Sequence, residues 1–126
     1  MAKKVMIFDD DEDLLEVCSL ILSARSFEVI LKNRCTDIIK DIQIHQPDVI
    51  LMDNWIPDLG GIRATNLIKT NREFSHIPVI FFSANNNVEE LAEQAGADFS
   101  LQKPFNIAEL EKLVLRAIEA GREKLA

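Results

Sequence analysis

The chain has few of the residues that mark cross-linked or repetitive proteins. Its 126 residues include two cysteines, four glycines, four prolines, one tryptophan and no tyrosine. The two cysteines, Cys18 and Cys35, are too few for a disulfide framework, so we expect both to be reduced and packed in the interior. No repeat, linker or low-complexity stretch is apparent, and we expect one domain over residues 1–126 without an output domain.

Long hydrophobic runs and a surplus of positive charge are also missing. No apolar run approaches the ~20 residues of a membrane span, and the first four residues lead into only four apolar ones, which is too few for a signal peptide. The net charge of -7 argues against nucleic acid or an anionic membrane as a partner. We therefore expect a cytoplasmic protein that binds neither.

Short apolar runs alternate with longer amphipathic segments along the chain. Hydrophobic residues make up 48% of it, which is enough for a core. The patterns predict strands at 5–8, 27–31, 48–52, 79–82 and 98–102, and helices at 13–26, 36–45, 62–70, 87–95 and from 106 to at least 118. Asn87 with Glu90, and Asn106 with Glu109, have the spacing of a capping box at a helix start.

The strands read as continuous apolar runs, and helices separate them. This pattern is typical of a parallel sheet that is covered on both faces. With right-handed crossovers, few topologies remain. We therefore predict an α/β protein with the (βα)5 doubly wound, flavodoxin-like fold, in which helices flank a five-stranded parallel sheet.

Polar residues stand where four of the predicted strands end. Asp9, Asp10 and Asp11 follow VMIF, Asp53 follows VILM, Ser83 follows VIFF, and Lys103 follows FSLQ. In a parallel α/β sheet the carboxyl ends of the strands open into one crevice, where ligands bind. We therefore expect these side chains to converge.

The expected cluster suits phosphoryl transfer. Crowded carboxylates repel one another, and Mg²⁺ is a usual remedy because it prefers oxygen ligands and often shares its site with phosphate. Asp53 would be a covalent nucleophile, Lys103 would neutralise one phosphoryl oxygen and Ser83 would hydrogen-bond another.

Each residue also has a plainer explanation. The first three aspartates suit a helix N-terminus, and Asp11 is expected to be only a cap. Asp53 suits a turn, and Ser83 a local hydrogen bond to the backbone. Lys103 alone would be a solvated charge. All four groups of polar residues are expected at the carboxyl ends of the strands of one sheet, and this shared placement favours a common site.

The motifs together resemble the receiver domain of two-component response regulators along essentially the whole chain. The resemblance rests on Asp9-Asp10, on PDVILMDNWIPDLGG around Asp53, on PVIFFSA around Ser83 and on GADFSLQKPF around Lys103. Each motif is weak alone, but their order and spacing are specific.

The resemblance implies a phosphorylation switch rather than a classical enzyme. Asp53 would accept a phosphoryl group from a sensor histidine kinase or a histidine phosphotransfer protein, with Mg²⁺ as cofactor. Asp10, Asp53 and the carbonyl of Trp55 would bind the metal directly, and Asp9 through water. Ser83 would be the switch hydroxyl.

Further implications of the resemblance concern the second half of the chain. Lys103 would precede a cis peptide to Pro104. The region from Asn87 to the last helix would change on phosphorylation and meet a downstream protein that the sequence does not identify. The chain would act as a single-domain regulator or relay element, as a monomer or weak dimer.

Two positions depart from the family pattern. The switch position three residues before the lysine is usually aromatic but here is Ser100, and strand alternation points the adjacent Phe99 to the opposite face. Trp55 stands two residues after Asp53, where small or polar residues are common. It is either packing filler or, as we predict, a shield that slows hydrolysis of the acyl phosphate.

Two other functions remain open from the sequence. A phosphatase of the haloacid-dehalogenase type would use Asp9 as nucleophile, with Ser83 and Lys103 as its second and third motifs. The chain is short for that fold, lacks a late acidic pair and would leave Asp53 without a role. The other alternative is a receiver-like module that binds partners without phosphorylation, in which Asp53→Asn would bind normally.

Overall fold

The computed structural model describes residues 2–125, over which five strands alternate with five helices. The strands are β1 (Lys4–Phe8), β2 (Glu28–Lys32), β3 (Val49–Asp53), β4 (Val79–Ser83) and β5 (Phe99–Gln102). The helices are α1 (Glu12–Ser23), α2 (Ile38–His45), α3 (Gly61–Lys69), α4 (Val88–Ala95) and α5 (Ile107–Leu125). The predicted order is confirmed, and most boundaries differ by a residue or two.

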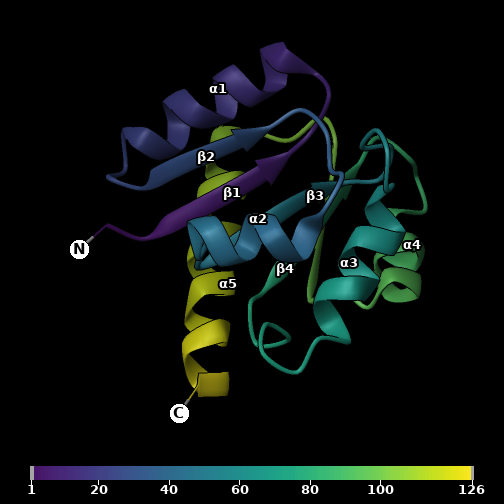
Figure 1. The fold of residues 1–126 in the computed structure, drawn as a ribbon. Helices are drawn as coiled ribbons and strands as arrows, with labels where there is room; N and C mark the ends of the chain where they lie inside the picture. Colours follow the sequence, from purple (N-terminus) through teal and green to yellow (C-terminus); the bar gives the residue numbers. More distant parts are fainter. Residues whose placement is uncertain (1, 126) are drawn as a thin grey trace.

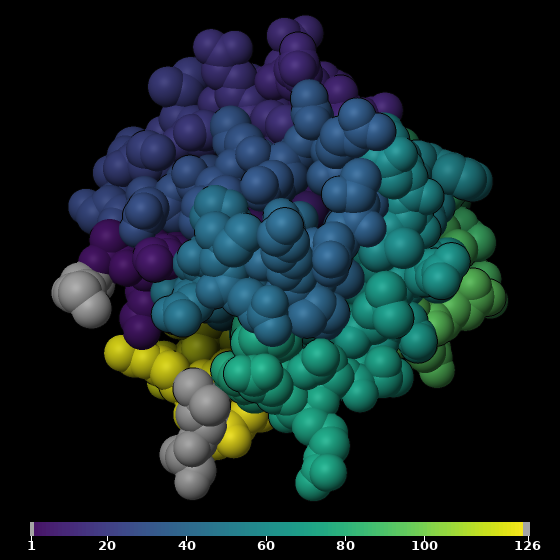
Figure 2. Space-filling view, viewed as in Figure 1, coloured from purple at the N-terminus to yellow at the C-terminus, as the bar shows by residue number. Residues whose placement is uncertain are grey.

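Within residues 2–125 the strands form one parallel sheet in the order β2-β1-β3-β4-β5. Helices α1 and α5 cover one face, while α2, α3 and α4 cover the other. Figure 1 shows α2 in front of the sheet and α5 behind it. In the same view, side chains around α2 and α3, in blue and teal, cover the front face (Figure 2). The predicted flavodoxin-like fold is confirmed.

The core is divided by the sheet, as the apolar strands predict. Successive strand residues alternate between faces, so Ile7 and Leu51 pack toward α1 and α5, whereas Met6 and Ile50 pack toward α2 and α3. All residues of β3 and β4 are buried. These two neighbouring strands therefore place the residues at their ends on a base that is shielded from solvent.

Local hydrogen bonds confirm one predicted capping box and contradict the other. The backbone N–H of Glu109 donates to Asn106 Oδ1 at 2.8 Å, and the Glu109 carboxylate accepts from the Asn106 N–H at 3.5 Å. Asn87 precedes α4 as predicted, but its side chain makes no capping bond among the described residues. Its φ of -98° and ψ of 32° depart from the extended conformation that a capping side chain requires.

The first helix is shorter than its apolar pattern predicts. It ends at Ser23, and Ser26 adopts a left-handed φ of 68° that turns the chain into β2. Cys18 and Cys35 are free and buried on opposite faces of the sheet, as expected for packed thiols. Among the described residues, no helix is both long enough and apolar enough to span a membrane.

Candidate functional site

The carboxyl ends of β1 and β3 meet at the centre of the sheet. The chain leaves β1 toward α1 on one face and β3 toward α3 on the other, so a crevice opens between them. Asp9 follows β1 directly, and Asp53 is the last residue of β3. The topology therefore brings together two residues that are 44 positions apart in the sequence.

Three carboxylates gather in this crevice. Asp9, Asp10 and Asp53 each offer an oxygen within 4.8 Å of the others. Asp9 is 1% exposed and Asp53 6% exposed, whereas Asp10 faces solvent. A set of closely spaced carboxylate oxygens with one open side fits a hard divalent cation such as Mg²⁺.

Lys103 reaches into the same crevice from the end of β5. Its Nζ donates hydrogen bonds to Asp9 Oδ2 at 2.5 Å and to Asp53 Oδ1 at 2.9 Å. Burial alone would lower the pKa of Lys103, but the bonds to both carboxylates outweigh it and raise the pKa. The lysine is therefore an ammonium at neutral pH, and its explanation as a solvated charge is wrong.

The charge at Asp9 is only partly compensated. Burial raises the pKa of Asp9 and the negative charge of Asp53 adds to this, although hydrogen bonds from Lys103 and from the N–H of Asp11 act in the opposite direction. The net effect is a raised pKa, so the ionised form is disfavoured in the folded protein. A bound cation would relieve this cost.

Asp11 has the plain role that its position suggests. Its Oδ1 accepts from the N–H of Leu14 at 3.1 Å and caps α1. Asp9 contributes to the same turn by accepting from the N–H of Asp11 at 2.9 Å. Capping therefore explains Asp11 fully and Asp9 in part, because the other oxygen of Asp9 points to Lys103.

Ser83 is the last residue of β4 and is 2% exposed. Its Oγ accepts from the N–H of Asn85 at 3.2 Å, and its carbonyl accepts from the N–H of Lys103 at 2.9 Å. The local bond expected of a strand-end hydroxyl is present, and the backbone also joins Ser83 to the lysine. The predicted cis peptide between Lys103 and Pro104 is confirmed.

The Trp55 side chain is not packing filler, since it is 74% exposed. Its backbone N–H donates to Asp53 Oδ2 at 3.1 Å, so its position is coupled to the nucleophile candidate. The indole lines a hollow of about 760 Å³ that also involves Asn54, Asn85 and Arg63. This hollow lies on the side of α3 and α4.

Ser100, which stands where the family usually has an aromatic residue, and the adjacent Phe99 lie on opposite faces of the sheet, as strand alternation predicts. Ser100 pairs with Phe81 in the register of β4 and β5, on the face of α4. Phe99 packs on the opposite face, where the guanidinium of Arg116 lies 5.7 Å from its ring centroid. Phe99 therefore does not occupy the place of the usual switch aromatic.

Two residues that contribute to the site were missed from the sequence. Gly61 starts α3 so close to β3 that a Cβ would lie 2.1 Å from the carbonyl oxygen of Asp53. The pair Gly60-Gly61 after the loop was a signal for such a close approach. Phe82, in the strand next to Asp53, places its ring centroid 4.5 Å from Lys103 Nζ. The sequence pattern indicated Phe82 only as the last residue of a predicted strand.

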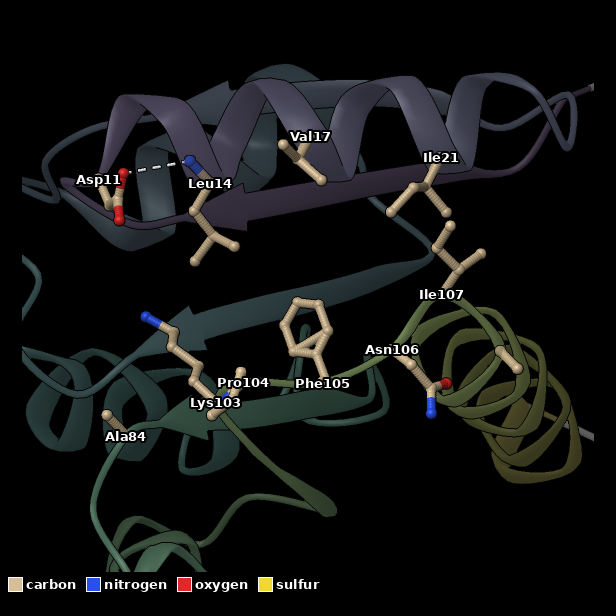
Figure 3. Close-up of a pocket in the computed structure, with 11 residues that line it drawn as sticks. Asp11, Leu14, Val17, Ile21, Ala84, Lys103, Pro104, Phe105, Asn106 and Ile107 are labelled. Carbon is tan, nitrogen blue, oxygen red and sulfur yellow. Dashed lines mark hydrogen bonds between the residues drawn. The ribbon is translucent and has the colours of Figure 1, made fainter.

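An apolar groove adjoins the carboxylates. It has a volume of about 790 Å³ and lies between α1 and the loop that follows β5. Figure 3 shows Leu14, Val17 and Ile21 on one wall, and Phe105 and Ile107 on the other. Lys103 belongs to the same lining, so the groove leads directly to the site.

Comparisons with known proteins agree with this geometry. The model of the response regulator receiver domain matches residues 5–115. The polar-differentiation response regulator DivK of Brucella ovis is 31% identical over 109 residues, which cover 85% of this chain and 89% of that protein.

Parts of two sensor proteins are similar as well. The CAI-1 autoinducer sensor kinase/phosphatase CqsS of Vibrio cholerae is 27% identical over 105 residues, or 81% of this chain, and the match spans 15% of that protein. A crystal structure of the receiver domain of sensor histidine kinase PA1611 from Pseudomonas aeruginosa is 27% identical, with a TM-score of 0.85 and coverage of 94% of this chain and 99% of that one. That structure has a magnesium ion coordinated in its active-site cleft.

The match to the family extends over most of the described chain and includes all strand residues except Lys4. The matched residues include Asp53, for which the phosphatase alternative offers no role. Receiver domains are signalling modules rather than classical enzymes. The chain belongs to the response regulator receiver domain family.

Proposed function

We propose that residues 1–126 form one receiver domain that accepts a phosphoryl group on Asp53. The observation that carries the proposal is the position of this carboxylate. It is buried at the end of a central strand, within 4.8 Å of oxygens from two other carboxylates and 2.9 Å from the ammonium of Lys103. Such a group is shielded from bulk water yet lies at the base of an open crevice.

The transfer step follows from these contacts. A carboxylate oxygen of Asp53 attacks the phosphorus of a phosphohistidine, the new O–P bond forms, and the P–N bond breaks. The imidazole keeps the electron pair of that bond and takes a proton from solvent. Lys103 pairs with a phosphoryl oxygen, and the Ser83 hydroxyl donates to another.

The donor set fits Mg²⁺. Asp10, Asp53 and the backbone carbonyl of Trp55 would hold the ion directly, with Asp9 acting through water. When bound, the ion screens the negative charge between the carboxylates and the incoming phosphoryl oxygens. The raised pKa of Asp9 supports this assignment, since a cation would offset the cost of its buried charge.

The phosphoryl group is then expected to shift a two-state equilibrium. Its added charge and its contacts with Ser83 and Lys103 favour one arrangement of the loop after β4. Ser100 lies on β5, next to β4, at the second switch position. Its side chain is too small to move as the usual aromatic side chain does. We propose that α4, β5 and α5 transmit the change to a downstream protein.

The phosphodonor partner is a sensor histidine kinase or a histidine phosphotransfer protein. The groove beside Lys103 has apolar walls, including the exposed side chains of Val17 and Ile107, and leads to Asp53. A partner that buries these walls would carry its phosphohistidine to the nucleophile. We propose that the chain itself is a monomer or weak dimer.

Intact mass after incubation with Mg²⁺ and acetyl phosphate tests the proposal. We expect a single acid-stable, base-labile phosphoryl adduct on the wild type that is absent from Asp53→Asn. An adduct that survives Asp53→Asn but is lost in Asp9→Asn would contradict the proposal and favour the phosphatase chemistry. Failure to detect an adduct with either acetyl phosphate or a cognate kinase would favour phosphorylation-independent binding.

A further inference from the structure

The lysine of the site has to cross a strand to reach its partners. Asp53 ends β3 and Lys103 follows β5, with β4 between them. Because neighbouring strands are about 4.8 Å apart, the Lys103 side chain has to extend over β4. The register pairs Phe82 of β4 with Asp53 on one side and with Leu101 on the other, so Phe82 lies beneath this path.

The contact between Phe82 and Lys103 has the geometry of a cation–π interaction. Lys103 Nζ lies 4.5 Å from the centroid of the Phe82 ring, and the ring is completely buried. Phe105 supports the ring at a centroid distance of 6.5 Å and an interplanar angle of 37°. Figure 3 shows Lys103 and Phe105 side by side on the same loop. A desolvated aromatic face of this kind attracts an ammonium group.

We propose that Phe82 is a positioning residue that holds the Lys103 ammonium at the site through its ring face. The inference rests on the proposed function, in which Lys103 pairs with a phosphoryl oxygen. Phe82 would be a new member of the site. Its side chain is apolar and does not touch the phosphoryl group.

The need for such a residue arises from competition at the carboxylates. The ammonium is held by Asp9 and Asp53. Of these two carboxylates, Asp53 is also proposed to bind Mg²⁺ directly and Asp9 through water. A cation that binds these oxygens weakens the hold of the carboxylates on the lysine. The face of Phe82 keeps the ammonium beside the site while those bonds are exchanged, whereas an aliphatic side chain would fill the volume without attracting the charge.

Fluorination of the ring separates this role from packing. Fluorine withdraws electron density from the ring face and changes its size little, so 4-fluoro-, 3,5-difluoro- and pentafluorophenylalanine at position 82 should weaken the attraction stepwise. With Mg²⁺ and acetyl phosphate, we expect the phosphorylation rate to fall stepwise, by about tenfold for the pentafluoro ring.

Phe81 provides the matched control. It is the preceding residue of β4, equally buried, and packs on the opposite face against Val88 and Ala92. The same fluorinated series at position 81 should leave the rate unchanged. A rate that is flat across the series at position 82, or that falls equally at both positions, would overturn the proposal.

A second readout does not depend on phosphorylation. The ¹⁵N signal of the Lys103 ammonium, recorded with Mg²⁺ present, persists only while the group is protected from exchange with water. We expect it in the wild type and its loss with pentafluorophenylalanine at position 82 but not at position 81. If the wild type is not phosphorylated, the proposed function fails and this signal alone decides the positioning role. If the rate falls while the signal remains, the effect does not act through Lys103 and the proposal is wrong.

Discussion

The two ends of the parallel strands, called here the amino edge and the carboxyl edge of the sheet, each hold an aspartate with lysine partners, but their charges balance differently. Asp98 at the amino edge is partly buried, whereas Asp9 and Asp53 at the carboxyl edge are buried. At the amino edge, Asp98 accepts from Lys69 and Lys124 and also from the N–H of Val79. At the carboxyl edge, Lys103 is shared between Asp9 and Asp53, with Asp10 close by. One carboxylate thus has two ammonium partners, whereas one ammonium serves a group of three carboxylates in the part of the chain that is described.

The pKa values show the consequence. Burial alone would raise the pKa of Asp98, but the hydrogen bonds from Lys69 and Lys124 outweigh it and lower the pKa. At Asp9 burial prevails, and the pKa is raised. The amino edge is therefore electrostatically satisfied and holds α3 and α5 to the sheet, while the carboxyl edge keeps a negative surplus that suits a cation. The same residue types make a structural cluster at one edge and a candidate reactive site at the other.

Removal of the shared lysine should have the largest effect. In Lys103→Met the aliphatic chain is largely kept but the ammonium is lost, so we expect phosphorylation from acetyl phosphate to slow by roughly 100-fold, the usual cost of removing one group that stabilises developing charge. The measurement is the rate of adduct formation by intact mass. Lys124→Met removes a lysine from the amino edge instead and should leave this rate unchanged; equal losses in the two variants would contradict the division of roles.

Asp98→Asn should cost stability without affecting the reaction. The substitution leaves Lys69, whose side chain is 13% exposed, without its ion-pair partner. Because the pair is only partly buried, we expect a loss of about 2 kcal/mol, less than the cost of breaking a fully buried pair. Urea unfolding would measure the change in the free energy of unfolding, and the phosphorylation rate of the folded variant should equal that of the wild type. A loss below 1 kcal/mol would show that the cluster at the amino edge is not a structural one.

Asp9→Asn should change stability in the opposite direction. The substitution removes a buried charge whose pKa is raised, so the protein without divalent cations should gain about 1 kcal/mol. Added Mg²⁺ should stabilise the wild type more than the variant, because a ligand stabilises only the folded state that binds it. Unfolding curves with and without Mg²⁺ test both statements, and a destabilised variant would contradict the idea of a negative surplus.

Acid titration should give the smallest effect and separate the two aspartates by sign. The pKa of Asp98 is lowered from 3.8, so its contribution to stability is fully present above about pH 4 and is lost as the pH falls through its folded pKa. The pKa of Asp9 is raised from 3.8, so its cost is present at neutral pH and disappears as the pH falls toward 3.8. Between pH 7 and pH 4, without Mg²⁺, the stability difference between wild type and Asp9→Asn should close while that for Asp98→Asn persists. If both stability differences from wild type disappeared over the same pH range, the contrast between Asp9 and Asp98 would be refuted.

The lifetime of the phosphorylated state is a separate prediction about Trp55. Its indole is exposed beside the crevice, and its N–H is bonded to Asp53. If the indole shields the acyl phosphate, Trp55→Asn should lose the phosphoryl group faster. Decay of the adduct after removal of acetyl phosphate measures this, and an unchanged decay rate would count against shielding.

Much of the molecule was predictable from local patterns. Apolar runs of strand length bounded by polar residues indicated the five strands, because a parallel strand that is covered on both faces has to be apolar throughout. The capping box at Asn106 was correct, because both partners lie within one helical turn. The similar spacing at Asn87 failed because the backbone of the preceding loop, not the identity of the residue, decides whether the side chain reaches the helix.

The sequence by itself determined the order of strands and helices, the polar residues at the strand ends and their resemblance to receiver domains, because these depend on periodicity and spacing along the chain. Only the tertiary structure decided how the charges are shared. The strand order brings Asp9 to Asp53, passes Lys103 over Phe82 and places Lys69 and Lys124 on Asp98. These contacts join residues distant in the sequence, and burial then determines which carboxylate has a lowered pKa and which a raised one, because both depend on neighbours that no local pattern specifies.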